Sequence, residues 1–252
     1  LHKMDYNYIF FDCETNSGRS HADILTISAL FVDKNFKLIE EFNCAARLRK
    51  SRIYEIDSFL VNGMDPFEVD KHPFSNFDLT KKTNDKFISW INKGPVLFCA
   101  HNGYQFDYML TSTHLFTNLF TWPWIFSTGN AKQIDSLPIL QNFDFYSPNT
   151  IAIELNEKSN KTFKLSSLCR MNGFDLGDKA HTAEADTLGM NKLMELVSKK
   201  NPELFKKCIS LNDKKNVLSR IKDVDYFCHP ETFFGRTRQF TSSYLCEHPV
   251  YK

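Results

Sequence analysis

The chain has 252 residues, of which 42% are hydrophobic and 24% are charged. That length and composition suit one large folded α/β domain, or one domain together with part of another. The seven cysteines are scattered, odd in number and without a Cys-x-x-Cys motif. This pattern argues against a disulfide framework or a zinc cluster, and it favours a reducing, cytoplasmic location.

No segment of the sequence has the pattern of a membrane or export signal. The longest apolar run, Ile24–Val32, is far too short to cross a bilayer. The first apolar run leads directly into acidic residues, which is not the pattern of a signal peptide. We therefore expect no association with a membrane.

The charge is unevenly distributed, although the net charge is only +1. Residues 199–252 contain eleven Lys and Arg against six Asp and Glu, a balance of +5, which leaves −4 for residues 1–198. An acidic front part would repel phosphates. The excess of acidic residues is understandable if some of those carboxylates hold cations.

Three strands are predicted first along the chain. Tyr8–Asp12 is a short apolar run of the kind found in buried strands. Ile24–Val32 and Leu38–Cys44 follow, with a turn at Asp33–Phe36 between them. Together the three segments indicate an antiparallel meander at the edge of a sheet.

Helices and a further buried strand alternate after the meander. Asp78–Asn92 is predicted to be a helix that Gly94-Pro95 stops, and Pro95–Ala100 to be a buried strand. The turn His101–Gly103 then leads into a helix from about Gln105 to His114.

Two more helices are predicted before residue 200. Lys164–Asn172 forms a short one, and Thr182–Lys200 the longest, with Thr182 as its N-cap and Pro202 beyond its end. The fold class is thus α/β, a mixed sheet with an antiparallel meander plus parallel strands, flanked by helices. Short helical pieces and an aromatic-rich stretch follow residue 200.

Candidate catalytic carboxylates stand at the ends of these elements. Asp12 and Glu14 are two residues apart, so a strand places both on one face. Asp107 falls in the first turn of a helix. Each has an ordinary explanation, because a strand can simply reach solvent and an acidic residue is favoured at a helix N-terminus.

Asp186 is harder to explain as a surface residue. On the helix that begins near Thr182 it shares a face with three apolar residues, Met190, Leu193 and Val197. His181 stands about one turn away from it. Alone, such a histidine is most often a surface or satisfied core residue.

Taken together, the four carboxylates and the histidine indicate one chemistry. Carboxylates can hold two Mg²⁺ or Mn²⁺ ions about 3.5–4 Å apart, which activate water and stabilise a leaving 3′ oxygen. Oxygen ligands without cysteine suit these ions better than zinc. A histidine can accept the proton of the attacking water at neutral pH.

At this point the sequence resembles the DEDDh 3′→5′ exonucleases of the ribonuclease H-like superfamily, most closely the bacterial exodeoxyribonuclease I enzymes. Three segments carry the resemblance: Phe10–Thr15, Ala100–Asp107 and Ala180–Asp186. Further similar stretches are Leu60–Pro66, Phe163–Leu165, Asn201–Phe205 and Phe233–Gly235. The similarity therefore spans nearly the whole chain in separate motifs.

The resemblance implies a role for each motif residue. Asp12, Glu14 and Asp186 would ligate the tighter of two Mg²⁺ ions, for which Mn²⁺ can substitute, while Asp107 would hold the second and His181 would be the general base. The residues expected to bind the last nucleotide are Thr15, Asn62, Gly63, Met64, Asn102 and Lys164.

Three neighbouring residues receive narrower expectations. Met64 would be an apolar wedge against a base, and Phe106 is expected to pack beneath the site rather than to touch DNA. Asp135 stands where the family often has an acidic residue, and a role at the start of a helix explains it equally well.

The resemblance also implies an organisation and partners. Residues 1–200 would form the exonuclease domain, and residues 201–252 connecting helices and the start of an accessory, SH3-like domain that is cut short. The expected substrate is single-stranded DNA, hydrolysed to mononucleotides, with single-strand binding protein as a partner and a monomeric enzyme.

Other functions stay open at this stage. An exoribonuclease, an oligoribonuclease or a polymerase proofreading module would use the same carboxylates, because no residue here reads the 2′-hydroxyl. An inactive nucleic-acid-binding scaffold normally lacks a metal ligand, and all five motif residues are present. An α/β protein with a surface acidic cluster would leave Asp186 unexplained.

Overall fold

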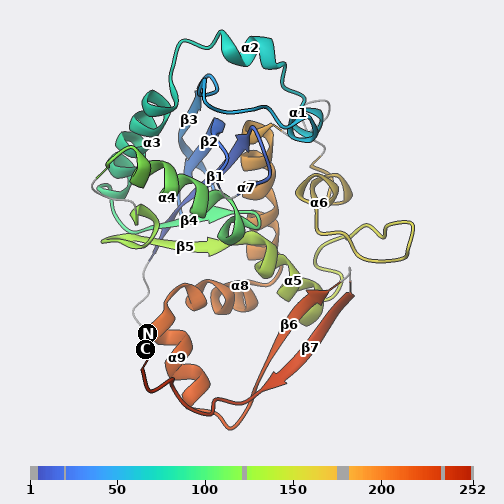
Figure 1. Ribbon diagram of the computed structural model, residues 1–252. Helices are drawn as coiled ribbons and strands as arrows, with labels where there is room; N and C mark the ends of the chain where they lie inside the picture. The colour runs from blue at the N-terminus through green and yellow to red at the C-terminus, as the bar shows by residue number, and fades with distance from the viewer. Residues whose placement is uncertain (1–4, 20, 121–123, 175–181, 234–235, 251–252) are drawn as a thin grey trace.

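We analysed a computed structural model, which describes residues 5–19, 21–120, 124–174, 182–233 and 236–250 (Figure 1). In this part of the chain, five strands form one mixed sheet in the order β3-β2-β1-β4-β5. The strands are β1 (Asn7–Thr15), β2 (Ile24–Val32), β3 (Leu38–Ala45), β4 (Val96–Ala100) and β5 (Ala131–Asp135). β1 pairs antiparallel with β2 and parallel with β4. The predicted fold class, an antiparallel meander joined to parallel strands, is confirmed.

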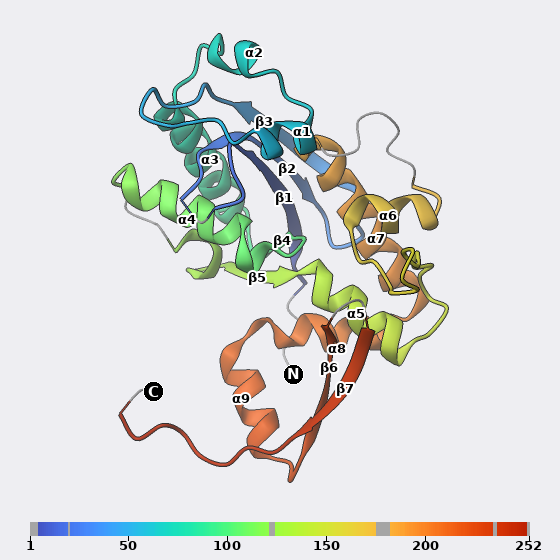
Figure 2. The same cartoon turned by 45° about the vertical axis from the view of Figure 1, so that its right-hand side comes forward.

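Helices cover both faces of the sheet, and a separate hairpin follows them (Figures 1 and 2). The helices are α1 (Ile56–Asn62), α2 (Pro66–Asp70), α3 (Asn76–Ile91), α4 (Asp107–Thr117), α5 (Ser136–Tyr146), α6 (Leu165–Met171), α7 (Ala183–Lys200), α8 (Pro202–Ile209) and α9 (Lys214–Lys222). Short 3₁₀ turns are η1 (Gly103–Gln105), η2 (Ile125–Ser127) and η4 (Ser210–Asn212). β6 (Phe227–Phe233) and β7 (Arg236–Ser242) form a two-stranded antiparallel sheet.

The predicted elements agree with the structure where their pattern is strong. β2 begins and ends at the predicted residues, and the helix predicted over Thr182–Lys200 is α7, with Thr182 as its N-cap. Four elements were not predicted: α1, α2, β5 and α5. α2 and β5 have only five residues each, and α5 contains Pro138 in its first turn. Such segments lack a long hydrophobic period.

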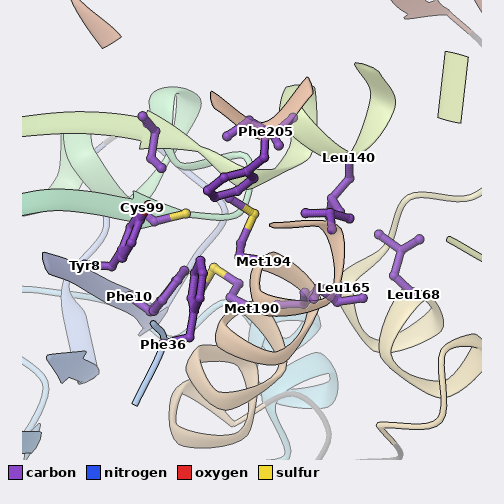
Figure 3. Packing of buried hydrophobic residues seen from close by; sticks show 14 of the residues in the cluster. Tyr8, Phe10, Phe36, Cys99, Leu140, Leu165, Leu168, Met190, Met194 and Phe205 are labelled. Carbon is purple, nitrogen blue, oxygen red and sulfur yellow. The ribbon is translucent and has the colours of Figure 1, made fainter. Parts of the chain in front are cut away.

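Alternation along β1 creates two hydrophobic cores. Tyr8 and Phe10 face one side, where they pack with α5, α6, α7 and α8 (Figure 3). Ile9 and Phe11 face the other side and pack with α3 and α4. Because side chains alternate in a strand, Asp12 and Glu14 continue the face of Tyr8 and Phe10, the face that α7 covers.

The long helix α7 lies on β1 and β2. Thr182 begins it, since its hydroxyl accepts a hydrogen bond from the Ala185 N–H at 3.3 Å. The apolar stripe predicted from the sequence (Met190, Leu193 and Val197) is completely buried. The position of Asp186, one turn before this stripe, is therefore fixed by core packing.

Residues after 200 continue to pack on the main body. Phe205 and Cys208 of α8 belong to the same core as Tyr8, and the Phe205 ring meets that of Phe36 edge-on at 6.0 Å. The β6–β7 hairpin lies against α5, where the Tyr146 hydroxyl donates to the Cys228 carbonyl at 3.5 Å. Among the residues that the structure describes, none of the helices has the length and apolarity needed to cross a membrane.

A close packing contact at Gly103 provides a test of the fold. A Cβ there would lie 2.4 Å from the Ala100 Cβ and 3.1 Å from the Tyr108 ring. That ring is held by hydrogen bonds from its hydroxyl to the Phe98 and Ile134 carbonyls. We expect Gly103→Ala to lower the free energy of unfolding by about 1–3 kcal/mol, measured by urea denaturation.

Gly18→Ala is the matched control for this substitution. An added Cβ at Gly18 meets no atom within 4 Å. Equal stability of the two variants would show that the turn before α4 is looser than the structure indicates.

Candidate active site

Asp12 and Glu14 lie where the central strand has lost its parallel neighbour. The pairing of β1 with β4 ends at Phe10, opposite Cys99. β2 continues alongside, with Asp12 opposite Ser28. The two carboxylates therefore project from a well-anchored strand at the end of the parallel part of the sheet. Both are half-buried.

Asp107 reaches the same place from the opposite face of the sheet. It is the first residue of α4 and only 2% exposed. Its Oδ1 accepts a hydrogen bond from the Cys13 N–H at 3.1 Å, between the two β1 carboxylates in sequence. A side chain of α4 thus bonds the main chain of β1 beyond the last residue that β4 pairs.

Asp186 completes the cluster from α7. Asp12, Glu14 and Asp186 each offer a carboxylate oxygen, and these three oxygens lie within 4.8 Å of one another. Segments 12–14, 107 and 186 are far apart in sequence, so the sheet and two helices bring them together. Residue 181, the predicted general base His181, lies outside the described residues.

The carboxylates repel one another strongly. Burial raises the pKa of Asp12 well above its ordinary value, and the charges of Asp107, Glu14 and Asp186 raise it further. Burial and the charges of Asp186 and Asp107 raise the pKa of Glu14 to about 8. Burial also raises the pKa of Asp107 to about 7, although its hydrogen bonds to main-chain N–H groups oppose the rise.

The donor set fits a hard divalent cation. Three carboxylate oxygens converge without a cysteine among them, which is the chemistry that Mg²⁺ and Mn²⁺ prefer. A cation would also offset the repulsion that raises these pKa values. Asp12, Glu14 and Asp186 are therefore the residues that could hold one metal ion, with Asp107 bonded to the strand that carries the first two.

A groove of about 550 Å³ opens beside Glu14. Its floor includes Thr26, Ser28 and Asn43 of the sheet, and the start of α7 closes one side. Three predicted nucleotide-binding residues line it: Asn62, Gly63 and Met64.

The groove wall formed by residues 62–64 is bonded to β1. Gly63 ends α1 in the left-handed conformation, with φ 67°. The Asn62 side chain donates to the Thr15 carbonyl at 3.3 Å and accepts from the Met64 N–H at 3.1 Å. Asn62 therefore connects the end of β1 to the residue predicted to contact a base.

The other predicted nucleotide-binding residues are placed differently. Thr15 is buried, and its hydroxyl donates to the Ser17 carbonyl within its own loop. Asn102 is exposed in a left-handed turn with φ 60°, and Lys164 is exposed at the N-cap of α6. None of these three is among the described residues that line the groove.

Asp135 and Phe106 support the site from below. Asp135 caps α5 by accepting from the Leu137 N–H, and it also accepts from the N–H groups of Asn102 and Tyr104. It therefore fixes the turn that leads to Asp107, in addition to its role at the start of a helix. Phe106 is half-buried and packs against the core, as expected.

Sequence reasoning did not predict the aromatic part of the groove. His72 and Phe74 line it, with ring centroids 5.6 Å apart. They lie in an irregular segment before α3 that carries no periodic signal. Thr26 and Ser28 had a recognisable signal, because polar residues alternate there within an otherwise apolar strand.

The repulsion in the cluster predicts how Asp12→Asn changes stability. Since folding raises the pKa of Glu14 from 4.5 to about 8, the metal-free parent should lose stability as the pH rises through this range. In EDTA at pH 8, Asp12→Asn should raise the free energy of unfolding by about 1 kcal/mol. Urea denaturation measures this change.

Adding Mn²⁺ should make the parent more stable than Asp12→Asn. The parent should gain stability by binding the ion, and Asp12→Asn should gain much less. Glu157→Gln, at an exposed position, is the control and should follow the parent. A variant that is less stable than the parent in EDTA would contradict the dominance of charge repulsion.

Comparisons with known proteins give the same fold. No family model matches the chain. The chain is similar to exodeoxyribonuclease I of Buchnera aphidicola subsp. Schizaphis graminum, with 28% identity over 253 residues, 97% of this chain and 51% of that protein. It is similar to the structure of E. coli exonuclease I in complex with a dA16 oligonucleotide, with a TM-score of 0.84 and 19% identity over 94% of this chain and 51% of that one.

A second similar structure is the zinc-bound form of the E. coli exonuclease I complex with single-stranded DNA. Its TM-score is 0.83 with 19% identity, covering 93% of this chain and 50% of that one. The chain thus spans about half the length of the relatives it matches. Over that half it has the exonuclease I fold, of the ribonuclease H-like type, and the predicted resemblance is confirmed.

Proposed function

We propose that the chain is a divalent-metal-dependent 3′→5′ exonuclease that hydrolyses single-stranded DNA to mononucleotides. One observation carries the proposal: Asp12, Glu14 and Asp186 converge beside a nucleotide-sized groove, with Asp107 bonded between the first two. The similarity to exodeoxyribonuclease I, a protein solved with bound oligonucleotides, supports this substrate and this reaction.

The carboxylates hold the metal ions in this proposal. Asp12, Glu14 and Asp186 would ligate one Mg²⁺, and Asp107 and Asp12 would hold a second. Bound there, the two ions supply an activated water and stabilisation of the leaving 3′ oxygen. Mn²⁺ can substitute because it accepts the same oxygen ligands.

His181 and the groove serve the substrate. His181 takes the proton of the attacking water, a task for which the ordinary pKa of histidine is suited. The last nucleotide lies in the groove against Asn62, Gly63 and Met64, where the Met64 side chain meets the base. Thr15 contributes its backbone, through the carbonyl that anchors Asn62.

The exposed residues Asn102 and Lys164 would contact the strand outside the groove. Asn102 follows His101 and Lys164 follows Phe163 in the sequence. Because His101 Nε2 lies 2.8 Å from the Phe163 carbonyl oxygen, the two segments lie side by side. A Lys at this position can neutralise a phosphate.

The proposal extends to partners and organisation. Exonuclease I has also been solved with SSB, so we propose single-strand binding protein as a partner of this enzyme. We also propose a monomer, with residues 1–200 as the nuclease domain and residues 201–252 as connecting helices and the start of an accessory, SH3-like domain.

A polarity assay tests the function directly. Single strands of dT16 labelled at the 5′ end should shorten stepwise from the 3′ end in Mg²⁺, and a blocked 3′ end should resist attack. EDTA should stop the reaction, and added Mg²⁺ should restore it. A matched RNA strand should decay more slowly. Faster decay of RNA would favour an exoribonuclease, and stepwise loss from the 5′ end would refute the polarity.

Two substitutions separate the proton acceptor from the metal ligands. We expect His181→Ala to lower kcat by about 10²–10⁴-fold while Mn²⁺ binding is retained, because a general base contributes on this scale. Asp12→Ala should lose both turnover and Mn²⁺ binding. Single-turnover kinetics and isothermal titration measure the two properties.

The control for these variants is His21→Ala, at an exposed position in the loop after β1. It should keep the parent rate. A His181→Ala protein with the parent kcat would remove that histidine from the mechanism.

A further inference from the structure

The wall of the groove that carries Asn62 and Met64 belongs to a weakly buried segment. We call residues 46–64, from the end of β3 through α1, the arm; in Figures 1 and 2 it lies beside the start of α7. Its apolar cluster contains only Leu25, Leu48 and Phe59 as buried members.

Most of the large apolar side chains of the arm face outward. Four of them are between 66% and 84% exposed: Ile53, Ile56, Leu60 and Val61. The stabilisation that a segment gains from packing is proportional to the apolar area that it removes from water. Apolar packing alone therefore stabilises the arm only weakly.

An ion pair with a buried carboxylate attaches the arm to the sheet. Asp23, immediately before β2, is only 1% exposed. Arg49 of the arm donates from Nε to both carboxylate oxygens at 2.9 Å, and its Nη2 bonds Oδ1. The Arg49 N–H adds a contact of 3.4 Å to Oδ2, and Arg52 Nε lies 3.5 Å from Oδ1.

Asn16 extends this attachment toward the active site. Its main-chain N–H and side-chain oxygen bond the main chain of Asp23 at 3.2 and 2.7 Å. Its amide donates to the Ile53 carbonyl at 2.9 Å, and its carbonyl accepts from the Glu55 N–H at 3.1 Å. The contacts run from Asp23 into the residues just before α1.

We propose that Asp23 and Arg49 are positioning residues for the substrate: their ion pair holds the arm so that Asn62 and Met64 form the wall of the groove. The inference rests on the proposed function for the identity of the substrate. Neither residue lines the groove or belongs to the carboxylate cluster. Their effect therefore reaches the substrate only through the arm.

The physical chemistry predicts a local effect. Replacing Asp23 removes the buried carboxylate that binds Arg49 and Arg52, and replacing Arg49 leaves that buried carboxylate with less compensation, which is costly. Of the arm residues, only Ala46 belongs to one of the two main cores, so the cost falls on the arm first. An arm that opens more often leaves fewer molecules with a formed groove, which weakens binding more than chemistry.

Asp23→Asn and Arg49→Lys test the proposal in the full chain. With 5′-labelled dT16, we expect KM to rise about tenfold for Asp23→Asn with kcat within about threefold of the parent. Arg49→Lys, which keeps the charge but loses the planar fork, should show a smaller rise in KM. Asp85→Asn is the matched control, because Asp85 pairs with Lys81 on the exposed face of α3.

Hydrogen exchange gives a readout that does not depend on catalysis. Amides of residues 47–62 should exchange at least about tenfold faster in Asp23→Asn, while those of β1 and α7 keep the parent rate. Faster exchange throughout the protein would mean a general structural role and would overturn the proposal. Arg49→Lys, the milder change, decides the case if Asp23→Asn folds poorly.

The proposed function and the positioning role of Asp23 and Arg49 can be refuted separately. A parent protein that leaves dT16 intact would refute the proposed function. The exchange rates would still show whether the ion pair of Asp23 and Arg49 holds the arm. Faster exchange in the arm with an unchanged KM would show that the arm does not position the substrate. Unchanged hydrogen exchange in both variants would show that the ion pair of Asp23 and Arg49 does not hold the arm, even if the parent is fully active.

Discussion

Mutual repulsion of carboxylates at the end of β1 is the constraint on which the rest of the structure depends. Burial and neighbouring charge raise the pKa values of Asp12, Glu14 and Asp107 together. A protein tolerates such a cluster only if strong packing elsewhere holds it. Here the central strand, bonded on both sides along its first half, and the buried stripe of α7 supply that packing. The same repulsion makes the site receptive to cations.

The groove beside this cluster has two sides of different character. The sheet and α7 form a side that is fixed by two large cores. The arm forms a side that polar contacts of Asp23, Arg49 and Asn16 attach to the sheet, with little apolar area buried. Segments of low local stability often carry ligand-binding residues, because they can adjust to the ligand. The carboxylate cluster thus stands on the rigid side, and the residues that we propose to contact the base stand on the adjustable one.

The residues on the rigid side of the groove could be predicted from the sequence better than those on the adjustable side. The period of two in β1 predicted that Asp12 and Glu14 share a face, and the apolar stripe of α7 predicted that Asp186 points inward. The hydrogen bond from Cys13 to Asp107 could not be predicted, because it depends on where β4 stops pairing. His72 and Phe74, like the ion pair of Asp23, belong to irregular segments whose contacts are set by tertiary structure alone.

The hydrogen bond between Asp107 and the main chain of Cys13 means that one residue serves both the fold and the site. Replacing Asp107 would deprive β1 of a buried acceptor as well as depriving the cluster of a charge. A substitution of Asp107 would therefore lower the stability of the fold as well as change the charge of the cluster. A neutral residue in place of Glu14 would instead remove a carboxyl group whose pKa is raised by burial and by the neighbouring charges.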